Sequence, residues 1–223
     1  MQNIQACVFD AYGTLFDFNS AAERCRDALG DKTDDLSAMW RTKQLQYTWL
    51  RAVMNRHKPF WEVTGDALDY SLQTLGIHDA ALRDRLMGLY HHIDAFPEVP
   101  EVLKTLKEAG MATAILSNGS PEMLEGAVQH TGIGDYLDAV LSVEEVGVFK
   151  PHPSVYELPT KRLGVAQQHI SFQSSNAWDA VAAATFGMKV VWCNRYGQPP
   201  EVLTAEPDCE VKTLAELPAL LGL

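Results

Sequence analysis

Four short stretches of this sequence place a carboxylate, a lysine and several hydroxyl and amide groups directly after apolar runs. Asp10 follows the apolar residues of ACVFDA, Ser117 and Asn118 close ATAILSN, and Lys150 stands in GVFKPHP. The last stretch, SSNAWD, carries Ser174, Ser175, Asn176 and Asp179. Carboxylates, lysines and hydroxyls are the groups that nucleophilic and acid–base catalysis uses. These residues could therefore form a catalytic site if the fold brings them together.

Each group also has an ordinary structural interpretation. Asp10 could open an Asx turn, and Lys150 could be a solvated charge in a loop rich in glycine and proline. Ser117 and Asn118 could form a turn and a helix N-cap. In SSNAWD, one polar residue could cap the following helix, and the acid could favour its N-terminus. The expected convergence of all four stretches, rather than any one of them, favours a catalytic site.

The elements that would carry these groups alternate between strand and helix. Apolar runs of strand length occur at 6–11, 112–118, 138–143, 169–175 and 189–194, with a weaker one at 209–212. From residue 98 onward they alternate with helical patterns at about 98–109, 121–131, 153–163, 177–187 and 213–221. This alternation predicts an α/β fold with a Rossmann-like, doubly wound parallel sheet. Ligands of such sheets bind outside the carboxyl ends of the strands, where all four polar stretches are expected to lie.

Residues 16–96 follow a different pattern. They show helical periodicity and hardly any strand signal, with patterns at roughly 19–29, 35–56, 61–76 and 79–92. A block of helices between the first strand and the others is typical of an inserted cap. PEVPEV at 97–102 is interpreted as a return linker, because its prolines disfavour helix in the residues before them. We therefore expect a core domain at 1–15 and 97–223 and a helical cap domain at 16–96.

Arg41 lies on the apolar side of the second helical pattern, where helical spacing groups it with Ala38, Leu45 and Trp49. Its aliphatic stem could cover this stripe while the guanidinium reaches water. Alternatively, its planar head could point from the cap into the cleft and bind a carboxylate in a bidentate manner. A similar choice applies to Phe60, which could pack in the core or line an apolar pocket.

The composition narrows the classes of function. The chain has 223 residues, of which 47% are hydrophobic and 21% charged, as in ordinary globular proteins. Its net charge of −11 argues against non-specific binding of nucleic acid or an anionic membrane. The four cysteines show no CxxC spacing, which suggests reduced thiols rather than disulfides or a zinc site. No basic leader and no apolar run near the ~20 residues that span a bilayer are present, so we expect a soluble cytoplasmic protein.

The motifs together resemble the haloacid dehalogenase superfamily along nearly the full length of the chain. The matching features are DAYGT, the serine of LSNGS, the lysine of FKP and the final acidic loop. Most members look like magnesium-dependent phosphatases, with a second aspartate two positions after the first and another in the last loop. This chain has Tyr12 and Ser175 at those places. It is more similar to the L-2-haloacid dehalogenases, which carry FDAYGTL, an early-helix arginine, SNG, FKPxxxxY and SSNAWD.

These two departures are consistent with metal-free cleavage of a carbon–halogen bond. Mg²⁺ prefers hard oxygen ligands, usually including carboxylates, so the loss of two aspartates predicts that no metal or other cofactor is used. A phosphatase also benefits from an acid that protonates an alkoxide leaving group. Halide is a very weak base and leaves without a proton. Tyr12 can then pack beside an apolar substrate.

The resemblance implies hydrolysis of short (S)-2-haloalkanoates to (R)-2-hydroxyacids with inversion. Asp10 would attack C2 and form an ester, which water would then hydrolyse. Lys150 would keep Asp10 ionised, and Arg41 with Asn118 would receive the halide. The other catalytic candidates are Thr14, Tyr156, Ser174, Asn176 and Asp179, the last as the base for the water. The other substrate-binding candidates are the amides of Ala11 and Tyr12, the hydroxyl of Ser117, and Phe60 and Trp178 as pocket walls.

Three further expectations follow from the resemblance and the sequence. Relatives commonly look like homodimers, so a homodimer is expected, with the haloalkanoate and halide as its small-molecule partners. A magnesium-dependent phosphatase or phosphonate-cleaving hydrolase, or an inactive binding protein on the same fold, stays open as an alternative. Finally, Pro159 lies inside a helical pattern, where it should remove a hydrogen bond and kink the helix. That kink would put the orientation of Tyr156 in question.

Overall fold

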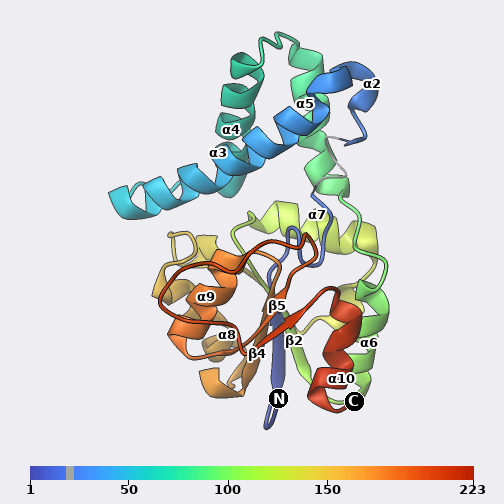
Figure 1. Ribbon diagram of the computed structural model, residues 1–223, viewed down its shortest axis with the longest axis vertical. Helices are drawn as coiled ribbons and strands as arrows, with labels where there is room; N and C mark the ends of the chain where they lie inside the picture. The colour runs from blue at the N-terminus through green and yellow to red at the C-terminus, as the bar shows by residue number, and fades with distance from the viewer. Residues whose placement is uncertain (19–22) are drawn as a thin grey trace.

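A six-stranded parallel sheet forms the centre of the molecule (Figure 1). The computed structural model describes residues 1–18 and 23–223. The strands are β1 (Ala6–Phe9), β2 (Ala112–Ser117), β3 (Ala139–Ser142), β4 (Ile170–Ser174), β5 (Lys189–Cys193) and β6 (Cys209–Val211). Their order is β3-β2-β1-β4-β5-β6, and every neighbouring pair is parallel. The predicted α/β fold and its six strands are confirmed.

The central strand β1 delivers Asp10 to the carboxyl edge of the sheet. All four side chains of β1 are fully buried, as expected for a strand covered on both faces. The chain continues from β1 to β2 on one side, whereas β4 pairs with β1 on the other. The strand order therefore reverses at β1, which is where ligands bind in sheets of this kind. The amide of Asp10 donates to the carbonyl of Gln173 at 2.9 Å and so fixes the end of β1 beside β4.

Helices cover both faces of the sheet (Figure 1). α6 (Val99–Glu108) and α10 (Leu217–Leu221) lie on one face, and α8 (Pro153–Leu163) and α9 (Ala177–Phe186) on the other. α7 (Pro121–Thr131) contacts β3 and the short helix η2 (Leu89–His92). The other short helices here are η3 (Gly134–Tyr136), η4 (Val143–Glu145), η5 (Gln167–His169) and η6 (Leu214–Glu216). α7, α8 and α9 each end at a glycine in the left-handed conformation, which is a common helix C-terminus.

The helices between β1 and β2 gather in a separate layer above the carboxyl edge of the sheet (Figure 1). They are α2 (Arg26–Leu29), η1 (Gly30–Lys32), α3 (Thr33–Met54), α4 (Phe60–Thr74), α5 (Ala80–Gly88) and η2. For the helix predicted at 19–29, positions 19–22 lie outside the described residues. The two chain crossings run side by side, since the amide of Asp17 donates to the carbonyl of Asp94 at 2.9 Å. We propose that residues 16–96 form the cap and residues 1–15 and 97–223 the core, and we use these names below.

Polar groups in the interface between α3 and α4 are paired. The most buried side of α3 carries Leu36, Trp40, Gln44 and Thr48, next to the half-buried stripe that contains Arg41. The indole of Trp40 donates to the carbonyl of Thr64 at 2.9 Å, and the amide of Gln44 donates to the hydroxyl of Thr64 at 2.8 Å. Buried polar groups are costly without such partners. α3 and α4 are therefore held in one relative position.

Three sequence expectations concern features away from the site. α8 runs unbroken from Pro153 to Leu163 with Pro159 inside it, so the proline does not end the helix. The four cysteines are all free thiols, as their spacing suggests. Across the described part of the chain, no helix has both the length and the apolar character needed to cross a membrane.

Candidate active site

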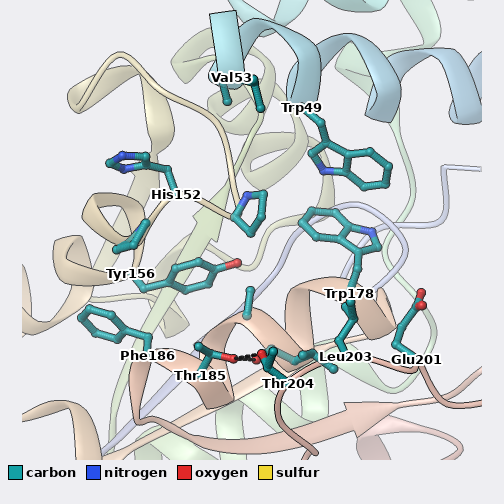
Figure 2. Close-up of a pocket in the computed structure, with 15 residues that line it drawn as sticks. Trp49, Val53, His152, Tyr156, Trp178, Thr185, Phe186, Glu201, Leu203 and Thr204 are labelled. Carbon is teal, nitrogen blue, oxygen red and sulfur yellow. Dashed lines mark hydrogen bonds between the residues drawn. The ribbon is translucent and has the colours of Figure 1, made fainter. Parts of the chain in front are cut away.

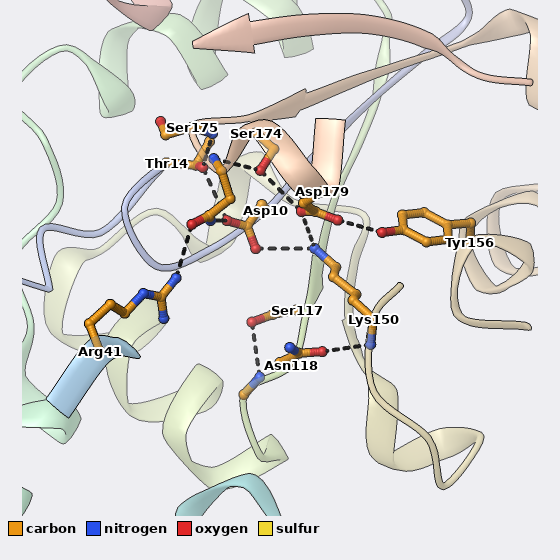
Figure 3. A network of polar contacts seen from close by, with 12 residues as sticks. Asp10, Thr14, Arg41, Ser117, Asn118, Lys150, Tyr156, Ser174, Ser175 and Asp179 are labelled. Carbon is orange, nitrogen blue, oxygen red and sulfur yellow. Dashed lines mark hydrogen bonds and ion pairs between the residues drawn. The ribbon is translucent and has the colours of Figure 1, made fainter. Parts of the chain in front are cut away.

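Lys150 joins two carboxylates at the carboxyl edge of the sheet (Figure 3). Its ammonium nitrogen lies 3.1 Å from Oδ1 of Asp10 and 2.8 Å from Oδ2 of Asp179. The side chains of Lys150, Asp10 and Asp179 are 1%, 9% and 0% exposed. Each of these buried charges is stabilised by its opposite, because a buried charge without a partner is very costly. The structure thus brings together three residues that are 140 and 29 positions apart in the sequence.

The charges of this cluster shift one another's pKa values. Burial alone would lower the pKa of Lys150, but the carboxylates of Asp10 and Asp179 outweigh burial and hold it above its usual 10.5. Burial raises the pKa of Asp179 above its usual 3.8, and Asp10 adds to this effect while Lys150 opposes it. Lys150 therefore stays protonated, and Asp179 is more basic than an exposed aspartate.

The second carboxylate oxygen of Asp10 is also held in place. Thr14 donates its hydroxyl to Oδ2 at 3.2 Å, and Asn176 donates its amide to the same oxygen at 2.8 Å. Thr14 is itself fixed, because its hydroxyl accepts the backbone N–H of Ser175 at 2.8 Å. The predicted catalytic residues Thr14 and Asn176 thus lie in direct contact with the predicted nucleophile. Both oxygens of Asp10 have hydrogen-bond or ion-pair partners, so the orientation of the carboxylate is fixed.

Asp179 is oriented by two hydroxyl groups besides Lys150. Tyr156 donates to Oδ1 at 2.6 Å and Ser174 donates to Oδ2 at 3.0 Å. Burial raises the pKa of Tyr156 well above its usual 10.0, and Asp179 raises it further, so the phenol is a neutral donor. Pro159 therefore leaves Tyr156 pointing at the cluster, and the kink expected from the sequence does not displace it. Ser174, Tyr156 and Asp179 form the second half of the site.

The loop after β2 contributes from the opposite side of Lys150 (Figure 3). Asn118 accepts the backbone N–H of Lys150 on Oδ1 at 3.0 Å, and Ser117 accepts the N–H of Gly119 at 3.0 Å. Within residues 1–18 and 23–223, the backbone N–H groups of Ala11 and Tyr12 have no hydrogen-bond acceptor. Two unpaired N–H groups beside Asp10 are suited to binding an anion.

Arg41 points from the cap into the core. Its guanidinium donates to Oδ1 of Asn176 at 3.1 Å and to Oε1 of Gln44 at 2.9 Å, and it lies over the ring of Phe18 at 4.9 Å. The cleft orientation considered from the sequence is therefore the one observed. Gln44 was not among the predicted site residues, although it follows Arg41 by three positions and so shares its side of the helix. It orients the arginine from within the cap.

Phe60 and Trp178, the two predicted aromatic walls of the pocket, lie in different places. Tyr12 stacks on Phe60 with ring centroids 6.4 Å apart, which puts Phe60 beside the Asp10 loop. Burial raises the pKa of Tyr12, and its hydroxyl has no partner among the described residues. Trp178 packs edge-on against Trp49 at 5.4 Å. These two indoles line an apolar groove of about 920 Å³ between α3, α8, α9 and residues 201–204 (Figure 2).

The donor set of the site does not suit a magnesium ion. Among the residues that the structure describes, no three His, Cys, Asp or Glu side chains are grouped to hold a metal ion. The two acids present, Asp10 and Asp179, both contact the ammonium of Lys150. Mg²⁺ requires several oxygen ligands in near-octahedral geometry, and Tyr12 and Ser175 supply no carboxylate.

Comparison with known proteins gives consistent matches over the whole chain. The family model described as haloacid dehalogenase-like hydrolase matches residues 4–187. The (S)-2-haloacid dehalogenase of Pseudomonas sp. strain YL is 45% identical, over 96% of this chain and 93% of that protein. (S)-2-haloacid dehalogenase 1 of Pseudomonas sp. strain CBS-3 is 42% identical, over 99% and 98%. The solved L-2-haloacid dehalogenase of Xanthobacter autotrophicus with chloropropionic acid covalently bound has a TM-score of 0.91 and 37% identity, covering 97% and 98%.

Proposed function

The chain belongs to the haloacid dehalogenase-like hydrolases and, within them, to the L-2-haloacid dehalogenases, and we propose that it hydrolyses short (S)-2-haloalkanoates through an ester on Asp10. The observation that carries this proposal is the buried carboxylate of Asp10. It lies at the switch point of the sheet and contacts Lys150, Thr14 and Asn176. A solved relative with chloropropionic acid covalently bound supports a covalent intermediate.

In the first step, an oxygen of Asp10 attacks C2 of the substrate from the side opposite the halogen. The new O–C2 bond forms as the C2–halogen bond breaks, and the halide leaves with the bonding electron pair. This in-line displacement inverts C2. The substrate carboxylate would bind the free N–H groups of Ala11 and Tyr12 and the hydroxyl of Ser117. Its repulsion with Asp10 amounts to about 4 kcal/mol at ~4 Å and an effective dielectric of about 20, which Lys150 and Arg41 can offset.

The departing halide needs hydrogen-bond donors that are already in place as negative charge moves from Asp10 to the halogen. Arg41 reaches Asn176, whose amide contacts Asp10, so its guanidinium lies next to the reacting carboxylate. Asn118 uses its Oδ1 on the backbone of Lys150, which leaves its Nδ2 as a donor. We assign these two donors to the halide, because preorganised donors stabilise charge that develops in the transition state.

In the second step, water attacks the ester carbonyl of Asp10, and Asp179 accepts its proton. The raised pKa of Asp179 makes it a better base than an exposed aspartate. Lys150 lies within 3.1 Å of Asp10 and stabilises the oxyanion that forms on its carbonyl. The ester bond then breaks, the proton passes to the alkoxide, and the (R)-2-hydroxyacid leaves. Asp10 is restored as a carboxylic acid that carries one oxygen from water, and it regains its charge by releasing the second proton of that water to solvent.

The proposal includes metal independence and two cellular features. The acids that a magnesium ion would need are bound to Lys150 in this site, and no step above requires a divalent cation. We further propose a homodimer, as the resemblance described in the sequence analysis implies. We also propose a cytoplasmic location, which the four free thiols support.

Halide release from both enantiomers of 2-chloropropanoate, with and without EDTA, tests the proposed function. We expect release from the (S) enantiomer alone and the same rate in EDTA. Magnesium-dependent release of phosphate from phosphate esters, without halide release, would instead establish the phosphatase alternative. Binding of 2-chloropropanoate without turnover of either enantiomer would establish the inactive binding protein.

A further inference from the structure

The N-terminus of cap helix α4 lacks a capping residue of its own. The helix begins at Phe60, and its N-cap position is Pro59, which makes no side-chain cap hydrogen bond. The first backbone N–H groups of any helix have no acceptor within that helix. Ser, Thr, Asp or Asn normally supplies the acceptor from the N-cap position. The N–H groups of Phe60 and Trp61 must therefore find acceptors elsewhere.

The core supplies both acceptors across the boundary with the cap. Oε1 of Glu144 accepts the N–H of Phe60 at 2.9 Å, and the hydroxyl of Ser120 accepts the N–H of Trp61 at 3.0 Å. Ser120 in turn donates to the same Oε1 of Glu144 at 2.7 Å. Ser120 is buried, and a carboxylate at a helix N-terminus is also favoured by the helix dipole. The first N–H groups of α4 therefore have their acceptors only when the cap domain is docked on the core.

We propose that Glu144 and Ser120 are positioning residues for the reaction, forming a latch that holds the cap closed over Asp10. In this role they touch neither substrate nor the reacting atoms. They fix the first turn of α4, and α4 carries or supports the parts of the cap that reach the site. This proposal goes beyond the proposed function and rests on it for its kinetic consequence only.

On the cap side, the latch acts on two parts of the site. Phe60 is the first residue of α4, and its ring lies 6.4 Å from Tyr12 and 6.1 Å from Phe149. One turn later, Thr64 accepts hydrogen bonds from α3, including one from Gln44 at 2.8 Å. Gln44 then holds Arg41 at 2.9 Å. Release of the latch would loosen the aromatic wall and the arginine together.

On the core side, the latch is joined to the loop after β2. The N–H of Glu144 donates to the hydroxyl of Ser142 at 3.2 Å, and that hydroxyl donates to the carbonyl of Gly119 at 2.7 Å. Gly119 directly follows Ser117 and Asn118, the proposed binders of carboxylate and halide. The same few hydrogen bonds therefore fix the first turn of α4, on the cap side of the pocket, relative to the loop after β2, on the core side.

A weakened latch should reduce the fraction of molecules whose pocket is closed before substrate binds. Apparent affinity falls in proportion to that fraction, so KM should rise while kcat changes less. Loss of one N-cap acceptor should therefore raise KM by roughly five- to tenfold. Glu144→Gln keeps an oxygen acceptor at the same place and should restore most of the wild-type KM.

Glu145→Ala provides a matched control. Glu145 is the next residue, is exposed, and pairs with Arg162 at 2.8 Å within the core. The first measurement is amide hydrogen exchange of Phe60 and Trp61, which needs no activity. The second is KM and kcat for (S)-2-chloropropanoate in wild type, Glu144→Ala, Glu144→Gln, Ser120→Ala and Glu145→Ala.

We expect faster exchange at Phe60 and Trp61 and a higher KM in Glu144→Ala and Ser120→Ala, and near wild-type values in Glu144→Gln and Glu145→Ala. If Glu144→Ala does not fold, Ser120→Ala carries the same two comparisons. Unchanged exchange in the folded variants would overturn the latch, whether or not the protein releases halide. Faster exchange with unchanged KM would overturn its positioning role. A protein that releases no halide but shows the expected exchange would contradict the proposed function and leave the latch standing.

Discussion

At the residue scale, Lys150 is the centre of the site, because its ammonium contacts both carboxylates directly. The sequence placed Asp10, Lys150 and Asp179 at strand ends, and parallel-sheet topology was enough to predict that they converge. The sequence could not show that one ammonium contacts both acids, since this depends on how Lys150 is oriented after Phe149. The spacing of three residues placed Gln44 near Arg41, but the hydrogen bond that gives Gln44 its role is visible only in the structure.

Replacement of Lys150 should harm both chemistry and folding. Lys150→Ala leaves Asp10 and Asp179 buried without their cation, so we expect loss of halide release and destabilisation by about 3–5 kcal/mol. Adding Asp179→Asn to Lys150→Ala should recover much of the stability and none of the activity, because it removes one unpaired charge. Urea unfolding alongside halide release checks both. Full stability of the single variant would show that the triad is not coupled.

Replacement of Arg41 should affect halide and rate without unfolding the cap. A hydrogen bond to a charged group contributes about 1.5–3 kcal/mol, so Arg41→Ala should weaken chloride inhibition and lower kcat/KM by roughly ten- to a hundredfold. Lys43→Ala is the control, since Lys43 is on the same helix but lies over Tyr70. Equal kcat/KM and equal chloride inhibition in the two variants would show that Arg41 takes no part in the reaction.

At the element scale, the strands were predictable to within one or two residues, because buried parallel strands are short apolar runs. The cap was less predictable. The most buried side of α3 includes Gln44 and Thr48, which helical periodicity would assign to solvent. They are buried because α4 packs there and Thr64 pairs with Gln44. The capping of α4 by Glu144 was equally out of reach, because the two lie 84 positions apart.

The loop between β2 and α7 has no room for a side chain at Gly119. A Cβ there would meet the ring of Tyr12 at 2.9 Å and Leu124 at 3.1 Å. Gly119→Ala should therefore displace Tyr12, raise KM, and destabilise the protein by about 1–3 kcal/mol. Gly88→Ala is a suitable control because it has open space around it and an ordinary backbone angle. Thermal unfolding and KM should be measured for both variants. Equal unfolding temperatures and equal KM values would show that the loop accommodates the methyl group.

At the scale of the whole molecule, the net charge of −11 is no obstacle to an anionic substrate, because the local cations of the site are Lys150 and Arg41. The junction between cap and core is stabilised by Arg195. It donates to the carbonyl of Thr14 at 2.9 Å, pairs with Glu98 at 2.6 Å, and lies over Phe96 at 3.9 Å. α6 begins at Val99, so most of the stretch interpreted as a return linker is helix, because a proline is tolerated in the first helical turn. Arg195 thereby connects the start of α6 to the loop that follows Asp10.

Loss of Arg195 should destabilise the protein in a pH-dependent manner. Burial raises the pKa of Glu98, but its backbone N–H, Arg195 and Thr213 outweigh burial and lower it below 4.5. A lowered folded-state pKa gives stability that is present above the unfolded pKa and lost as pH falls through the folded value. Both side chains are only partly buried, so Arg195→Ala should cost about 2 kcal/mol at pH 7, as for a hydrogen bond to a charged group, and progressively less below pH 4.5. A difference from wild type that does not depend on pH, in urea titrations, would contradict this.

The central claim is that Asp10 itself, and not water, bonds to C2. A single turnover in heavy-oxygen water, with enzyme in excess over (S)-2-chloropropanoate, tests it by mass spectrometry of both product and protein. We expect the label in the peptide that contains Asp10 and an unlabelled hydroxyl in the 2-hydroxypropanoate. Label in the product hydroxyl on that first turnover, with none in the protein, would contradict the claim.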